Sequence, residues 1–180
     1  MILLHAGFRM PPTKLPPDHH LVRNVPWGKL RKDENDPEKV IGVLGEAFKM
    51  RPVEQTLSTT WLEYFAGTRQ QQVYGAIRAM RASSLDIKTN SGFAVGNVGN
   101  IAAAAAARDY SIRVLHEPTE DNKAHVALRR WPRDDMLLFE LLAAEAWSEL
   151  VLNNSPDIPN GAQAAPDQSA WAPSHDRKDR

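Results

Sequence analysis

The sequence predicts a single α+β domain with a mostly antiparallel sheet packed by two or three helices. Short apolar and β-branched segments follow one another along the chain and are joined by turn-forming residues, a pattern typical of strands that pair with their neighbours in sequence. Stretches with helical spacing or an alanine-rich composition close these units. The length of 180 residues, of which 42% are hydrophobic, fits one hydrophobic core.

The two ends of the chain differ in composition from the middle. Residues 1–18 contain two Pro-Pro pairs, which hold the chain extended and predict a proline-rich leader. Residues 153–180 carry four prolines and many small polar residues. They predict a disordered tail in which Trp171 is a candidate anchor for a partner. The α+β domain is therefore predicted over residues 19–152.

Two strands and a charged loop are predicted in the first part of the domain. Residues 20–25 form a β-branched run that Pro26 ends, because proline cannot donate a hydrogen bond to a strand ladder. The charged residues 29–39 then predict a loop. Residues 48–51 alternate between apolar and basic side chains, as a half-buried strand does, and Pro52 closes that strand.

A surface helix is predicted from residue 69 to residue 82. Thr68 precedes it and is a favourable N-cap, since its hydroxyl can accept a hydrogen bond from an amide of the first turn. Val73, Ile77 and Met80 recur at spacings of four and three. They therefore predict one buried face.

Two strands and an alanine-rich helix are predicted next. Residues 85–88 and 93–98 have the composition of strands, and the turn-forming residues 90–92 join them. Asn100 is expected to cap a helix built on the alanines of residues 102–107, because alanine has the highest helix propensity.

The last part of the domain predicts a hairpin and a long helix. Residues 111–116 and 123–131 are expected to form two strands joined by the polar loop 117–122. A helix is predicted from about residue 134 to residue 152. Its first turn is acidic, which favours the helix dipole, and its apolar face consists largely of leucines.

Charge and composition exclude several classes of function. Lysine plus arginine equals aspartate plus glutamate at 22 each, so a nucleic-acid partner would need a local basic patch and is not expected. The absence of cysteine removes disulfide scaffolds, thiolate zinc sites and thiol nucleophiles, and no metal or other cofactor is expected. No segment reaches the ~20 apolar residues of a membrane span. The apolar start lacks the features of a signal peptide, so the sequence predicts a cytoplasmic protein.

Four side chains are the main candidates for chemistry: His20, Arg23, His116 and His125. The last two lie on the strands of the predicted hairpin, where two imidazoles could share a metal or act as an acid and base pair. A metal site usually has at least three protein ligands, so two partly exposed strand residues are the alternative. Arg23 and the histidines near it could bind phosphate or carboxylate, or form a polar strand edge.

The segment from Leu57 to Glu63 also invites a catalytic interpretation. The order of Arg23, Ser58 and Glu63 is similar to the Arg, Ser-Thr and Glu order of some mono-ADP-ribosyltransferases, which would use the glutamate to orient a ribose. That family places its glutamate much farther from the serine. Ser58 or Thr59 as the N-cap of a short helix explains the same residues.

An anion-binding site is predicted at Gly96, Gly99 and Asn100. These residues lie where a strand is expected to run into the alanine-rich helix, and backbone amides at a helix N-terminus can hold an anion. The two glycines fall short of the dinucleotide-binding fingerprint, and no P-loop lysine follows them. A tight turn is the alternative.

Scattered residues resemble a set of small bacterial hypothetical proteins. The shared pattern includes His20-x-x-Arg23, Leu57-Ser58-x-x-Trp61-Leu62-Glu63, Phe93-Ala94-Val95-x-Asn97-Val98-Gly99 and Ala124-His125-Val126. The relatives have Ser-His-Ala at the last histidine, where this chain has Ala-His-Val. The resemblance covers roughly residues 19–150 and implies no activity.

These observations predict an interaction or accessory subunit of a multi-gene bacterial system, without catalytic activity of its own. The expected partner is a protein that the sequence does not identify, and the oligomeric state stays open. The alternative is a small transferase or hydrolase that acts on a nucleotide-like substrate through His20, Arg23, His116 and His125. A pocket that gathers three of these side chains would favour the enzyme, whereas a scatter over separate faces would favour the interaction subunit.

Overall fold

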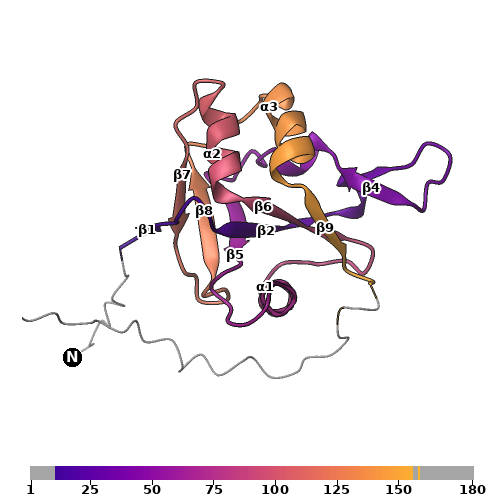
Figure 1. Ribbon diagram of the computed structural model, residues 1–180, viewed down its shortest axis with the longest axis horizontal. Helices are drawn as coiled ribbons and strands as arrows, with labels where there is room; N and C mark the ends of the chain where they lie inside the picture. The colour runs from indigo at the N-terminus through magenta and orange to yellow at the C-terminus, as the bar shows by residue number, and fades with distance from the viewer. Residues whose placement is uncertain (1–10, 156–157, 159–180) are drawn as a thin grey trace, which may run out of the picture.

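The computed structural model describes residues 11–155 and Ile158 and confirms the predicted α+β fold. At its centre is a seven-stranded sheet in which every pairing is antiparallel. Helix α1 (Arg69–Ala82) covers one face of this sheet, and helices α2 (Val98–Ala106) and α3 (Met136–Leu141) cover the other (Figure 1).

The seven strands lie in the spatial order β1, β7, β8, β5, β2, β6, β9. Their bounds are β1 Thr13–Lys14, β2 His20–Val25, β5 Leu57–Trp61, β6 Gly92–Asn97, β7 Arg113–His116, β8 His125–Arg129 and β9 Glu149–Leu152. A separate hairpin pairs β3 (Leu30–Lys32) with β4 (Val40–Val43). It projects beyond the β9 side of the sheet (Figure 1) and is flanked by two 3-10 turns, η1 (Trp27–Lys29) and η2 (Gly45–Phe48).

The alternation of side chains along the strands divides the hydrophobic core into two layers. The layer between the sheet and helices α2 and α3 contains Leu21, Leu57, Ala94, Val126 and Leu128, packed with Phe48, Phe139 and Trp147. The layer between the sheet and α1 contains Val22, Phe93 and Val95, packed with Val73, Ile77 and Met80. Both faces of the central strands are therefore covered.

The predicted surface helix is confirmed as α1. The Thr68 hydroxyl accepts a hydrogen bond from the Gln71 amide, and the Gln71 side chain accepts one from the Thr68 amide. This reciprocal pair is a capping box, which satisfies two amides at the helix start. The predicted face of Val73, Ile77 and Met80 is buried.

The alanine-rich helix begins earlier than its alanines predict. Asn97, and not Asn100, is the N-cap of α2, because the Asn97 side chain accepts a hydrogen bond from the Asn100 amide. Val98 and Ile101 are buried. Their burial starts the helix directly after β6, so tertiary packing and not alanine propensity fixes this end.

Residues 57–61 form the central strand β5. The predicted short helix capped by Ser58 or Thr59 is therefore not formed, and that prediction is wrong. Thr59 and Thr60 are buried, and the Thr59 hydroxyl donates to the Val126 carbonyl. β-Branched and aromatic side chains fit a pleated sheet better than a helix, and here the strand lies between β2 and β8.

Other predicted elements need correction. Residue 48 ends η2 and residues 49–51 have no regular secondary structure, residues 85–88 form no strand, and β3 lies inside the predicted loop 29–39. The predicted helix 134–152 ends early: α3 continues as a π-helical turn, η3 (Leu142–Ala146), and the chain then returns as β9. Helical periodicity and a buried strand are hard to distinguish in a short apolar run, which explains this error.

Both ends of the described chain extend the core beyond the predicted domain. In the predicted leader, β1 pairs with β7, and Leu15 is buried. In the predicted tail, Asn153 accepts hydrogen bonds from the Arg81 guanidinium, and Ile158 is buried in the layer beside α1. Trp171 lies outside the described residues. Of the helices in the described part of the chain, none has the length and apolar character to cross a membrane.

Candidate functional site

The four candidate side chains do not form one site. His116 pairs in register with Val126, so the side chains of His116 and His125 point to opposite faces of the sheet. His116 Nε2–H donates to the Lys123 carbonyl and His125 Nδ1–H to the Glu117 carbonyl, each over 2.8 Å. These two histidines therefore share neither a metal nor a proton-transfer path. No cluster suited to a metal ion is present among residues 11–155 and 158.

Arg23 is used to hold the fold together. Its Nε–H donates to the Ala47 carbonyl and its Nη1–H to the Ser58 carbonyl, both over 2.8 Å, which ties β2 to η2 and β5. Desolvation lowers the pKa of Arg23 to about 10, and the nearby Glu54 carboxylate opposes that shift. Two of its five N–H donors are thus given to carbonyls of the fold, which accounts for the position of this side chain without a bound anion.

His20 forms the strongest polar contact among the candidates. Its Nδ1–H donates to Glu63 Oε1 over 2.7 Å, and its backbone amide donates to Glu63 Oε2 over 2.8 Å. Arg69 lies 3.9 Å from the same carboxylate and donates to Glu149 over 3.0 Å. In the neutral imidazole this hydrogen bond places the proton on Nδ1 and leaves Nε2 as an acceptor, which is the arrangement of an oriented general base.

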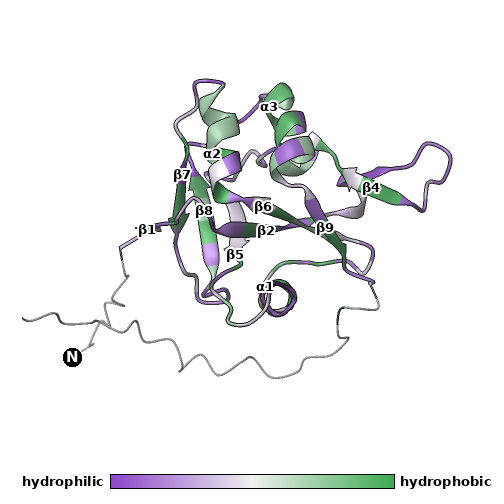
Figure 2. Ribbon diagram, in the orientation of Figure 1, coloured by the Kyte–Doolittle hydropathy of each residue, from purple (hydrophilic) through white to green (hydrophobic). Residues whose placement is uncertain are grey.

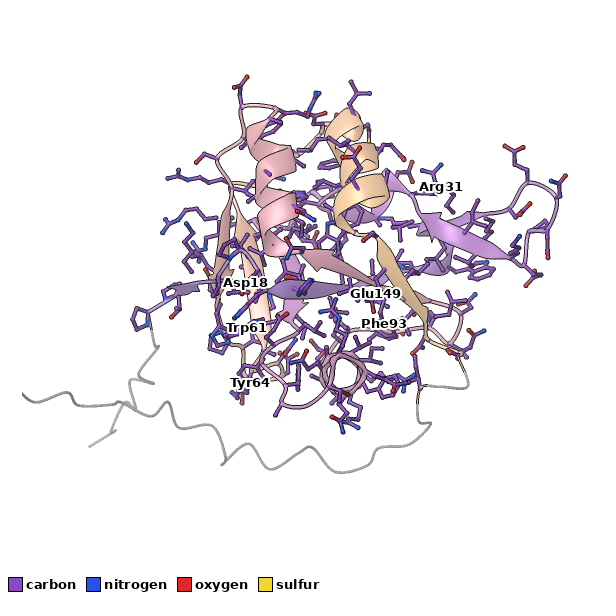
Figure 3. All side chains as sticks on the ribbon, in the orientation of Figure 1. Asp18, Arg31, Trp61, Tyr64, Phe93 and Glu149 are labelled. Carbon is purple, nitrogen blue, oxygen red and sulfur yellow. The ribbon has the colours of Figure 1, made fainter. Side chains whose placement is uncertain are left out.

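An aromatic cluster, which the sequence did not indicate, surrounds Trp61. Its indole N–H donates to His19 Nδ1 over 3.1 Å, and the two rings stack with centroids 5.5 Å apart. His116 and Tyr64 contact the same indole, with centroids 5.2 and 6.1 Å away. Figure 3 shows Trp61 and Tyr64 near Asp18, at the end of the sheet far from Arg31. The rings pack against one another, so this cluster joins the segment before β2 to β5 and β7.

The predicted anion site has its amides already engaged. At the start of α2, the Val98 amide donates to the His19 carbonyl, the Gly99 amide to the Pro17 carbonyl and the Asn100 amide to Asn97. An anion would have to displace these partners. The glycines also have packing roles: a Cβ on Gly96 would lie 2.6 Å from Trp147 Cδ2, and one on Gly99 would lie 2.9 Å from the Pro17 carbonyl.

A groove of about 790 Å³ lies between the β3–β4 hairpin and the β9 side of the sheet. Its lining includes Ile41, Trp147, Leu150 and Leu152, and none of the four candidate side chains. Ile41 on β4 is 53% exposed. Figure 2 shows the apolar character of β4 and of the second half of β9 beside the polar hairpin loop.

Charged residues mark the same groove. Arg31 on the hairpin pairs with Glu140 of α3 over 2.6 Å, and both line the groove. The other Glu140 oxygen accepts from the Gly45 amide. This carboxylate thus ties the hairpin and η2 to α3. The sequence did not indicate the groove, because residues 149–152 have a helical pattern although they form β9.

The two edges of the sheet differ in how they are protected. β1, at one edge, has two residues, carries Lys14 and is flanked by prolines, all features that prevent pairing with another chain. β9, at the other edge, has the sequence Glu-Leu-Val-Leu, with neither proline nor lysine. Among the described residues, β9 pairs only with β6 and β4 only with β3. An unprotected apolar strand edge therefore borders the groove.

Comparison of the chain with protein-family models, with curated proteins and with solved structures finds no match. The resemblance to a set of small bacterial proteins thus stays a prediction. The function has to be argued from the geometry of the molecule.

Proposed function

We propose that this protein is a non-catalytic interaction subunit, an accessory member of a multi-gene bacterial system that works in the cytoplasm. The four side chains that would carry catalysis lie at separate places, and Arg23, His116 and His125 donate to main-chain carbonyls of the protein itself. Groups that catalyse one reaction have to converge on one substrate, so their separation favours an interaction subunit.

The observation that carries this proposal is the unprotected edge of β9 beside the apolar groove. Natural sheets protect free edges, since an exposed strand edge pairs readily with another chain. This sheet protects one edge with a short, proline-flanked strand, while at the other edge no strand from residues 11–155 pairs with the outer side of β9. Adding a strand to such an edge is a common way for a protein to bind an extended segment of a partner.

Site-specific photo-crosslinking in the native host tests the proposal. A benzophenone amino acid placed at Ile41, in the groove, should crosslink to a defined partner polypeptide. The same group at Leu85, which is 49% exposed and lies outside the groove lining, is the matched control and should not. Equal crosslinking at both positions, or none at Ile41 under conditions in which the gene is expressed, would contradict an interaction surface at the groove.

One observation favours a second candidate, a small transferase or hydrolase of nucleotide-like substrates. His20 is held by Glu63 with its Nε2 left as an acceptor, and Trp61 and Tyr64 lie close by in the aromatic cluster. Hydrolysis of nucleoside phosphate esters that His20→Ala abolishes, and that His125→Ala leaves unchanged, would support this candidate. Equal rates for both variants and the wild type would assign any activity to a contaminant.

A further inference from the structure

We propose that the groove beside β9 binds an extended, apolar segment of a partner protein that is flanked by lysine or arginine and adds a strand to the sheet. This inference rests on the proposed function and specifies the chemistry of the partner. It is carried by the geometry of the β9 edge, by the side chains that line the groove and by the local excess of negative charge.

The backbone of β9 offers donors at its outer edge. The Asn153 amide donates inward to the Ser91 carbonyl, and β9 continues in regular antiparallel register with β6. Because inward and outward amides alternate along an antiparallel strand, the amides of Leu150 and Leu152 point outward, away from β6. Within the described residues no strand pairs with them. An added strand would supply the missing carbonyls.

The side chains of β9 fit the same occupant. Leu150 and Leu152 pair with Ala94 and Gly92, so they lie on the α3 side of the sheet and line the groove. Every second residue of an added strand would point into the groove beside them. Alternate apolar residues in the partner would cover these leucines and Ile41, which is half exposed without a partner.

Trp147 adds an independent sign of a missing partner. It lines the groove and is 2% exposed, and its indole N–H is buried without a hydrogen-bond acceptor in the described part of the chain. A buried donor that lacks an acceptor is costly, so most have one. An indole can only donate, and its nitrogen is buried, so a main-chain carbonyl of the bound segment would accept from it only after the ring turns toward the groove.

Charge decides between a second copy of the chain and a different partner. Residues 140–149 carry three glutamates and no basic residue. In the hairpin loop, Glu34, Asp36 and Glu38 are exposed and belong to no ion pair that the structure shows, and the same holds for Glu145. The hairpin also carries Arg31 and Lys39, which pair with Glu140 and Asp33, and Lys32, whose ammonium lies over the Trp27 ring, so the excess of negative charge comes from the unpaired acids alone. Two copies joined at β9 would bring these carboxylates together, whereas a segment flanked by lysine or arginine would meet opposite charge.

Selection from a library of random linear peptides, displayed and panned against the full chain, tests the inference. The enriched peptides should have apolar residues at alternate positions and basic residues at the flanks. Their dissociation constants should rise about tenfold or more in Leu152→Lys, which places a protecting lysine on the edge, and in Trp147→Phe, which removes the indole donor. Circular dichroism confirms that each variant is folded.

The charge requirement has its own matched pair. Glu145, which follows the lining residue Ala144, is exposed. Glu145→Lys should weaken the enriched peptides several-fold, and added salt should reduce the difference. Glu120→Lys, an exposed acid in the loop between β7 and β8, should leave binding unchanged. Enrichment of acidic peptides, or of peptides whose binding ignores Leu152→Lys, would overturn the inference. A dimer in sedimentation that Leu152→Lys dissociates would also overturn it and assign the edge to a second copy.

The two proposals fail in different ways. If Ile41 crosslinks to a partner but the library yields no peptide that binds at the edge, the interaction function stands and the extended basic segment is refuted. If neither experiment detects binding at the groove, both are refuted.

Discussion

Replacing Gly96 by alanine tests the packing that brings β9 to the edge of the sheet. The new methyl carbon would lie 2.6 and 2.8 Å from two ring carbons of Trp147 and 3.0 Å from the Ala146 carbonyl oxygen. Ordinary carbon contacts are at ~3.5–4.0 Å, so the indole would have to move by about 1 Å. Phe48 stacks on the same indole with centroids 5.0 Å apart, and both rings are buried, which leaves little room on that side.

Overpacking of this kind costs roughly 1–3 kcal/mol, and the rigid ring and the backbone contact place Gly96→Ala in the upper part of that range. For a chain of this length, a loss of about 2–3 kcal/mol lowers the melting temperature by about 4–12 °C. Thermal and urea melts measure the change. Gly42→Ala is the matched control, because no atom lies within 4 Å of its added Cβ, and it should change stability by no more than about 0.5 kcal/mol.

A double-mutant cycle identifies the clashing partner. Gly96→Ala should cost much less in a Trp147→Leu background, because the ring that the methyl group meets is gone. An equal cost in both backgrounds, or a Gly96→Ala variant as stable as Gly42→Ala, would refute the packing argument. A stable Gly96→Ala variant that had lost affinity for phosphate would instead support the anion site predicted from the sequence.

Three other predictions follow from the described contacts. Ile158→Ala should destabilise the protein by ~2–5 kcal/mol in urea melts, although the residue lies in the predicted tail, because its side chain is 3% exposed against α1. Asp121→Asn should be less stable than the wild type at neutral pH. The difference in unfolding free energy between the two should shrink as the pH falls below about 4. Hydrogen bonds from the Ser84 amide and hydroxyl lower the pKa of Asp121, so the stabilisation is present above the unfolded pKa and is lost as the pH falls toward the folded one. Nitrogen NMR should show His19 as the Nε2–H tautomer, since its Nδ1 accepts from the Trp61 indole; an Nδ1–H form would contradict the cluster.

Local sequence signals predicted the elements whose ends are fixed by local chemistry. Thr68 caps α1 because its hydroxyl and the Gln71 side chain satisfy each other's amides, an interaction between residues three apart. The strand at residues 20–25 ends where Pro26 removes a donor. The strand predicted at residues 123–131 contains β8, in which alternation places the buried Leu128 and the partly exposed His125 on different faces.

Contacts between distant segments decided the rest. Residues 149–152 became a strand because β6 lies beside them, and no residue nearby in sequence announces that pairing. Asn97 displaced Asn100 as the cap of α2 because burial of Val98 starts the helix directly after β6. The four candidate side chains were predicted correctly as polar residues on strands, but only the register shows that two of them lie on opposite faces. The groove could not be predicted either, because its β9 side depends on the pairing of β9 with β6, two segments far apart in the sequence.

Amide hydrogen exchange at the outer edge of β9 tests the central claim most directly. In the free protein, the amides of Leu150 and Leu152 should exchange quickly, while the amide of Val151, which faces β6, should be protected. The partner that crosslinking at Ile41 identifies, or a peptide enriched from the library, is then added. Either should slow amide exchange at Leu150 and Leu152 and leave exchange at the β1 edge unchanged. Slow exchange at these two amides in the free monomer, or protection on binding that appears elsewhere and not on β9, would contradict strand addition at this edge.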